Sequence, residues 1–99
     1  MDKQREIILS ILYLREKVWG RTYLQKFLYL ITRELFENKL FSYVNYKYGP
    51  FSDELNTMVT ELEFQDIINE SAELTKGLKT GYIYELTPKG KKIAEEIFN

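Results

Sequence analysis

Apolar residues recur at helical spacing in four segments of this 99-residue chain. Positions three and four apart lie on one face of a helix, so each segment is expected to bury one stripe. The expected helices span about residues 3–18, 22–38, 53–65 and 88–98. Their inward positions are Ile7, Ile8, Ile11, Leu12, Leu14 and Val18, then Leu24, Phe27, Leu28, Ile31 and Leu35, then Leu55, Met58, Val59 and Leu62, and finally Ile93, Ala94, Ile97 and Phe98.

Residues that suit helix N-termini precede each of these segments. Asp2 and Ser52 are expected to cap the first and third helices, because a short polar side chain can accept a hydrogen bond from a free backbone N–H. Thr22 and Gln25 have the spacing of a capping box for the second helix. Pro88 fits the first position of the last helix, where a missing N–H costs nothing.

Two further stretches have the composition of strands. Residues 41–48 are aromatic and β-branched and alternate, so that Val44, Tyr46 and Tyr48 share one face of a strand that Gly49-Pro50 ends. Residues 67–69 and 82–86 flank a polar, glycine-containing run and predict a hairpin with a long loop. The elements predict an α+β fold, a single domain in the order helix, helix, strand, helix, strand, loop, strand, helix.

This order resembles the winged-helix group of DNA-binding domains, in which such a hairpin is the wing. Tyr82-Ile-Tyr-Glu-Leu-Thr-Pro-Lys-Gly-Lys-Lys92 resembles the strand-to-helix junction of MarR- and PadR-type regulators, which bind operator DNA as dimers. Leu24-Gln-Lys-Phe-Leu-Tyr-Leu30 and Tyr46-Lys-Tyr-Gly-Pro-Phe-Ser52, followed by Leu55, are similar to the core of Panacea domains, which include SocA-like antitoxins and phage-associated proteins. Small winged-helix proteins of archaea and their viruses are similar in size and in lacking cysteine. The resemblances imply a DNA partner in one case and a protein partner in the other.

Composition argues against several classes of function. The chain has no histidine, no cysteine and no phosphate-binding glycine loop, so we expect no catalytic residues, no metal site and no cofactor. It contains no apolar stretch long enough to span a bilayer and no signal-peptide pattern, so we expect a cytoplasmic protein without a membrane partner. A homodimer through the first and last helices is a further hypothesis.

The net charge of −1 is unevenly placed, and it supports two hypotheses. Residues up to 47 are mildly basic, whereas acids predominate between 48 and 75 without a base before residue 76. If double-stranded DNA is the partner, polar and basic side chains of the loop, the last helix and the second helix would contact its phosphates. One amide side chain on the third helix would contact base edges. These DNA-binding candidates are Lys76, Lys79, Thr80, Lys89, Lys91, Lys92, Lys26 and Asn56.

The alternative is a protein–protein interaction module that uses the acidic third helix, because carboxylates there would repel a phosphate backbone. The protein-binding candidates are Glu54, Glu61, Glu63, Tyr46 and Tyr48. Tyr43, Tyr46 and Tyr48 could also stack on single-stranded bases, but tyrosines on an alternating strand more often pack against the neighbouring helix. DNA binding is the first hypothesis and protein binding the second.

Overall fold

The computed structural model describes residues 2–37, 40–47, 49–74, 77 and 80–98. The helices in these ranges are α1 (Lys3–Arg15), α2 (Arg21–Phe36), α3 (Asp53–Phe64) and α4 (Pro88–Phe98). The strands are β1 (Lys17–Trp19), β2 (Val44–Tyr46), β3 (Gly49–Phe51), β4 (Ile68–Leu74) and β5 (Thr80–Leu86). The prediction of an α+β fold with a small antiparallel sheet is confirmed.

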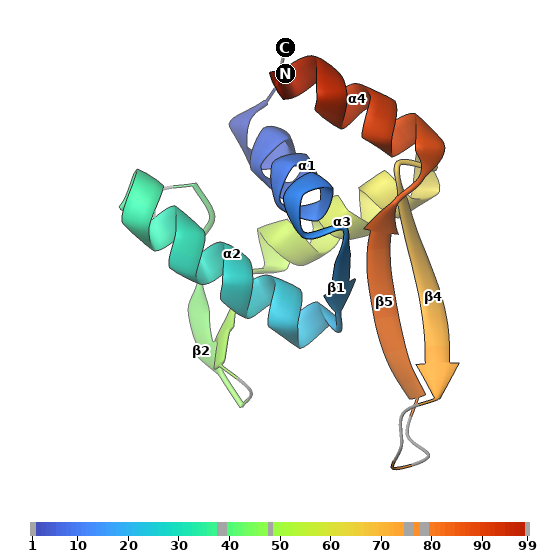
Figure 1. Cartoon of the computed structure of the whole chain (residues 1–99). Coiled ribbons are helices and arrows are strands. Elements are labelled where there is room, and N and C mark those ends of the chain that lie inside the picture. Colours follow the sequence, from blue (N-terminus) through green and yellow to red (C-terminus); the bar gives the residue numbers. More distant parts are fainter. Residues whose placement is uncertain (1, 38–39, 48, 75–76, 78–79, 99) are drawn as a thin grey trace.

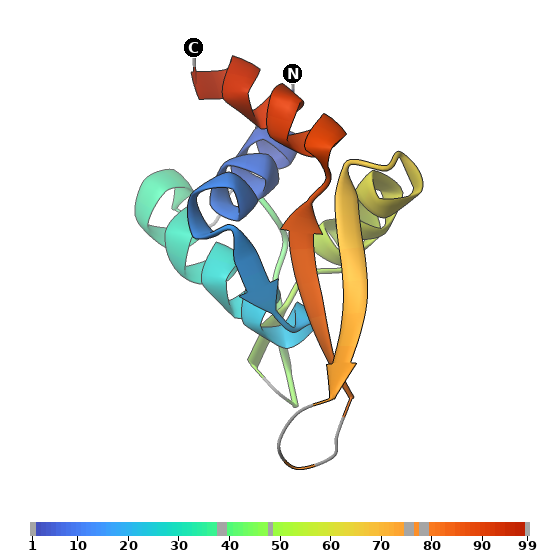
Figure 2. The same ribbon diagram turned by 45° about the vertical axis from the view of Figure 1, so that its right-hand side comes forward.

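The main sheet has three antiparallel strands in the order β1-β5-β4, and Figure 2 shows them side by side. Tyr84 in the central strand pairs with Val18 of β1 and with Glu70 of β4. At the end near α4 the hairpin is anchored by buried Ile68, whereas Leu74 at the other end of β4 is exposed. The outer half of the β4–β5 hairpin therefore extends beyond the helices (Figure 1).

The hydrophobic core lies where α1, α2 and α3 meet the inner face of the sheet. Each helix contributes side chains three or four positions apart, as the sequence pattern requires. α4 packs along α1, where the rings of Tyr13 and Phe98 are 5.4 Å apart. The most completely buried apolar side chains are Ile8, Leu9, Leu12, Val18, Leu24, Leu28, Leu55, Val59, Leu62 and Ala94.

Three of the predicted caps are confirmed. Asp2 accepts a hydrogen bond from the backbone N–H of Gln4 (2.8 Å). Ser52 caps α3 by accepting from the N–H of Leu55 (3.2 Å). Pro88 begins α4, and the hydroxyl of the preceding Thr87 accepts from the N–H of Gly90 (3.0 Å).

The first helix is shorter than predicted. It ends at Arg15, because Glu16 adopts a positive φ of 67° and residues 17–19 form β1 instead of a last helical turn. Val18 is buried as predicted, but as part of a strand that pairs with β5. Leu14 and Leu35, predicted to face inward, are both 67% exposed.

Two predictions between residues 20 and 51 are wrong. The N-cap of α2 is Gly20 (φ 102°) without a side-chain hydrogen bond, so Thr22 and Gln25 form no capping box. The single strand predicted over 41–48 is instead a hairpin of two three-residue strands, β2 and β3, and Pro50 lies inside β3 instead of ending a strand. Tyr48 lies outside the described residues.

Candidate nucleic-acid interface

Arg21, the first residue of α2, joins three elements. Its guanidinium donates to the hydroxyl of Tyr84 in β5 (3.1 Å), to the side-chain oxygen of Asn56 in α3 and to the carboxylate of Glu63 in α3 (2.8 Å). The carboxylate of Glu70 in β4 lies 3.5 Å away. These contacts hold the N-terminal end of α2 against α3 and the β4–β5 hairpin, with two carboxylates beside the one guanidinium.

The two carboxylates at this junction influence each other. Burial raises the pKa of Glu63 above its ordinary value, and the neighbouring Glu70 raises it further through a hydrogen bond and its charge. The guanidinium of Arg21 opposes both effects. A carboxyl with a raised pKa in the folded state destabilises the fold as it ionises, so the junction depends on the cation of Arg21 near neutral pH.

A groove opens between the first turn of α2 and β5, and we call it the hairpin groove. None of the described residues that line it is acidic, although the whole chain has a net charge of −1. The groove also adjoins the N-terminal, positive end of the α2 dipole. Gly20, the N-cap, offers no side chain that could accept hydrogen bonds from the first N–H groups of the helix. The lining residues are Trp19, Gly20, Arg21, Thr22, Tyr23, Lys26, Thr80, Gly81 and Tyr82.

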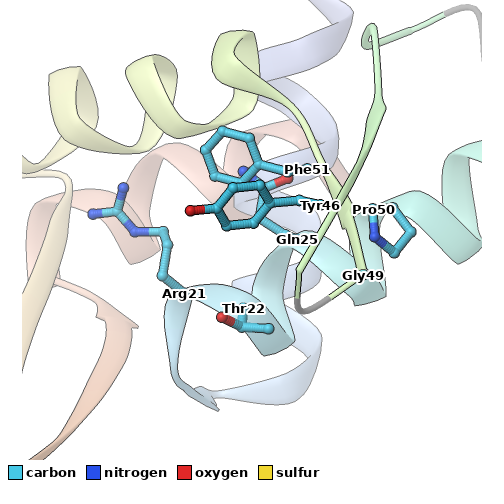
Figure 3. A pocket seen from close by; sticks show the side chains of 7 residues that line it. All are labelled: Arg21, Thr22, Gln25, Tyr46, Gly49, Pro50 and Phe51. Atoms are coloured by element: carbon cyan, nitrogen blue, oxygen red, sulfur yellow. The ribbon is translucent and has the colours of Figure 1, made fainter.

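A second recess continues from Arg21 and Thr22 toward the β2–β3 hairpin (Figure 3). In this view the Tyr46 hydroxyl is directed toward Arg21, and its ring lies 5.5 Å from that of Phe51. Gly49 and Pro50 form the opposite wall. None of the described residues lining this recess carries a carboxylate either, but Arg21, which lines both recesses, is in contact with the partly exposed carboxylates of Glu63 and Glu70.

The wall between this recess and the core is fixed by a buried pair of hydrogen bonds. The side chain of Gln25 donates to the backbone carbonyl of Ser52 (2.9 Å) and accepts from the backbone N–H of Ser52 (2.9 Å). Gln25 is 2% exposed and Ser52 is fully buried. Gln25 therefore connects α2 to the start of α3, in place of the capping role that its spacing suggested.

The structure brings together only part of the predicted DNA-binding set. Lys26 and Thr80 line the hairpin groove, whereas Lys76 and Lys79 lie outside the described residues. Lys89, Lys91 and Lys92 are exposed on α4, which follows the opposite end of the hairpin from Thr80. Thr80 is separated from these three lysines by the length of the hairpin, seven residue pairs or about 20 Å, so Thr80 and the lysines of α4 do not share one patch.

Asn56, Lys89 and the acidic candidates have contacts within the chain. Asn56 accepts from Arg21, and Lys89 donates to the backbone carbonyl of Gln65 (2.9 Å). The carboxylate of Glu54 accepts from the N–H of Ser42 (2.8 Å) and from Gln4 (3.3 Å), and these hydrogen bonds lower the pKa of Glu54.

Two of the three acidic protein-binding candidates accept hydrogen bonds from other parts of the chain. Glu63 is paired with Arg21, and Glu54 holds the segment before β2, whereas Glu61 is exposed on α3. Tyr46 is 61% exposed, and Tyr48 lies outside the described residues. Two of the four carboxylates of α3, those of Glu54 and Glu63, therefore accept hydrogen bonds within the chain.

Sequence reasoning did not select Arg21, Trp19, Tyr23 or Tyr82, which line the groove. One signal for Arg21 is available, because a cation in the first turn of a helix is disfavoured by the dipole and so needs a partner elsewhere. The aromatic side chains carry no comparable signal. Trp19 and Tyr82 line the same groove because β1 pairs with β5, with Trp19 opposite Ile83, although 60 residues of chain separate the two strands.

Comparison with known proteins identifies a similar fold and no family. No protein-family description and no curated protein matches the chain. A solved structure that is similar is the crystal structure of the circadian clock associated protein Pex from Anabaena. It shares 20% identity with a TM-score of 0.56, and the match covers 95% of this chain and 72% of Pex. At this level of identity the likeness concerns the fold.

Within the described ranges, no cluster of three or more acidic or other metal-ligating side chains could hold a metal ion. No helix in the part of the chain that the structure describes is long and apolar enough to cross a membrane.

Proposed function

We propose that this chain is a non-enzymatic regulator that binds double-stranded DNA through a winged-helix arrangement. The order α1-β1-α2-α3-β4-β5, with β1 beside β5 in the sheet, supports this assignment, and the β2–β3 hairpin is then an insertion between α2 and α3. The resemblance of residues 82–92 to MarR- and PadR-type regulators supports it as well. The β4–β5 hairpin acts as the wing.

The observation that carries the proposal is the composition of the hairpin groove. It combines Lys26, the hydroxyls of Thr22 and Thr80 and the N-terminal end of α2 on a surface whose described lining residues include no carboxylate. Lysines, hydroxyl groups and helix N-termini are the groups that contact DNA phosphates. Both hairpins extend from the same end of the molecule as this groove, where they can flank a duplex (Figure 1).

The acidic α3 is the weaker candidate surface. Glu54 and Glu63 already accept hydrogen bonds within the chain, so a partner that used them would have to compete with Ser42 and Arg21. Asn56 is likewise bound to Arg21 and is poorly placed to read bases. The groove therefore predicts binding dominated by phosphates, with weak dependence on DNA sequence.

The test is fluorescence anisotropy of the full chain with a labelled mixed-sequence duplex at low and physiological salt. We expect micromolar binding at low salt that weakens as salt is added, since non-specific binding arises from counterion release. Lys26→Ala should weaken binding and reduce the salt slope by about one. Thr80→Asp should weaken it more, because it adds a carboxylate to the groove.

Two lysine variants provide the matched controls. Lys3 lies at the start of α1, at the end of the molecule opposite the outer ends of β4 and β5 (Figures 1 and 2), and Lys3→Ala should leave binding unchanged. Lys92→Ala should also have no effect if the groove is the site. Absence of binding at low salt, or an equal loss for Lys3→Ala and Lys26→Ala, would contradict the proposal.

A further inference from the structure

α2 carries an exposed apolar stripe on the side away from the core. Tyr23, Phe27 and Leu30 are four and three positions apart and therefore share one face of the helix. Tyr23 is 49% exposed and Leu30 is 52% exposed, and the rings of Tyr23 and Phe27 meet edge to face at 5.3 Å. Together with Lys26 they line one shallow recess. Contiguous exposed apolar side chains of this kind are typical of contact surfaces.

Cations surround this stripe. The guanidinium of Arg15, at the end of α1, lies 4.6 Å above the ring of Phe27. Lys26 and Arg33 are both exposed. Lys26 lies four positions before Leu30 and Arg33 three positions after it, so both are on the same side of α2 as Leu30. Glu34 adds one negative charge near its edge. We call the surface formed by Arg15, Tyr23, Lys26, Phe27, Leu30 and Arg33 the α2 face.

We propose that the α2 face docks an acidic, amphipathic segment of a protein partner. The apolar stripe fits aliphatic side chains at helical spacing, which is the pattern of helix-in-groove recognition. The surrounding cations fit carboxylates on either side of those aliphatic residues, and such charge complementarity selects partners and increases the rate of encounter.

The charges and the stripe argue against two other occupants. In a second copy, Lys26 and Arg33 would meet a surface with the same excess of cations, and like charges brought together across an interface are costly. In a DNA complex, Phe27 and Leu30 would face phosphate oxygens, which gain nothing from apolar neighbours. An acidic segment is the occupant that uses both the apolar and the charged parts of the surface.

The position of the α2 face gives the docking a regulatory consequence, which rests on the proposed function. Tyr23 and Lys26 line both the recess of the α2 face and the hairpin groove. A segment bound to the α2 face would occupy Lys26 and place carboxylates beside the path of the DNA backbone. The acidic partner and DNA should therefore compete for the protein.

The probe is a fluorescein-labelled designed peptide helix of about four turns, with leucines at positions i, i+3, i+4 and i+7 and glutamates at the flanking positions. A matched peptide carries lysine at every glutamate position. Anisotropy titrations with the full chain should show binding of the acidic peptide and at least about tenfold weaker binding of the basic one. Leu30→Glu and Arg33→Glu should each weaken binding of the acidic peptide about tenfold.

Phe64→Glu provides the control for adding a carboxylate at an exposed apolar position, because Phe64 is 89% exposed on α3 and lies outside the α2 face. Circular dichroism of each variant verifies that the fold is retained. Equal binding of the two peptides, equal loss with Phe64→Glu and Leu30→Glu, or no binding of the acidic peptide would overturn the proposal. Concentration-dependent dimerisation that Leu30→Glu abolishes, without peptide binding, would replace it with a second copy.

Competition distinguishes this proposal from the proposed function. Unlabelled acidic peptide should displace labelled duplex from the wild-type chain, and should fail to displace it from Leu30→Glu. If the chain binds the acidic peptide through Leu30 and Arg33 but binds no duplex, docking stands and the DNA-binding proposal fails. If Leu30→Glu weakens duplex binding as much as Lys26→Ala does and no peptide binds, the α2 face belongs to the DNA site and the docking proposal is wrong.

Discussion

Gly90→Ala tests how α4 is seated on the rest of the fold. Gly90 is buried in the first turn of α4, and a Cβ there would lie 2.1 Å from the carbonyl oxygen of Ile67 and 3.2 Å from a methyl group of Leu86. The Ile67 carbonyl is fixed, because it accepts hydrogen bonds from the backbone N–H and the hydroxyl of Thr87 (3.0 and 3.2 Å). Backbone at both sides of the contact must therefore move for the methyl group to fit.

Two effects of Gly90→Ala oppose each other. Alanine is favoured over glycine inside a helix by about 1 kcal/mol. Overpacking costs about 1–3 kcal/mol or more, and a contact of 2.1 Å is more than an ångström inside ordinary van der Waals distance. We expect the steric term to dominate and the free energy of unfolding to fall by about 2 kcal/mol, which lowers Tm by about 8–16 °C in a domain of this size.

Urea unfolding and thermal melts followed by circular dichroism measure this change. Gly77→Ala is the matched control, because a Cβ at Gly77 meets nothing within 4 Å, and its effect should stay within about 0.5 kcal/mol. If Gly90→Ala is as stable as the wild type or more stable, helix propensity dominates and the close seating of α4 on Ile67 is refuted.

Three further predictions concern polar contacts. Gln25→Leu should cost about 1–3 kcal/mol in urea unfolding, since it leaves the buried N–H of Ser52 unpaired, whereas the carbonyl of Ser52 keeps the hydrogen bond from the N–H of Asn56; an unchanged stability would contradict the buried pair. Arg21→Met should raise the pKa of Glu63 further, so that Tm falls more steeply than in the wild type as pH rises above 4.5; parallel Tm profiles would contradict this. Glu54→Gln should flatten the acid side of the Tm profile, because the lowered pKa of Glu54 gives stability at neutral pH that is lost as pH falls through that pKa; an unchanged acid side would count against it.

The helices and most of their caps could be predicted from the sequence because their signals are local. Asp2, Ser52 and Pro88 lie within a few residues of the N–H groups or helix ends that they affect. The four-helix pattern depends on the spacing of apolar residues within single segments, which is independent of the rest of the chain. Leu14 and Leu35 show the limit of that argument, since a residue near a helix end can match the stripe and still extend past the core.

The parts that could not be predicted depend on contacts between distant segments. β1 has three residues, too few for a periodic pattern, and Val18 pairs with Tyr84 across 66 positions. Gln25 matched a capping box locally, but its partner Ser52 is 27 residues away. Likewise, nothing near Lys89–Lys92 in the sequence reveals that the hairpin places them at the opposite end from Thr80.

The role of the acidic residues shows why net charge gave limited guidance to function. Arg21 stands at a helix N-terminus, where the dipole disfavours a cation, and its position is compensated by Glu63 and Glu70. Glu54 is similarly used by the N–H of Ser42. Three of the seven acids between residues 48 and 75 thus have partners within the chain, and no carboxylate is among the described residues that line the hairpin groove, although Glu63 and Glu70 lie against Arg21 at its edge. The distribution of paired and unpaired charges in three dimensions, more than their sum, is what makes a phosphate-binding surface possible on a chain with a net negative charge.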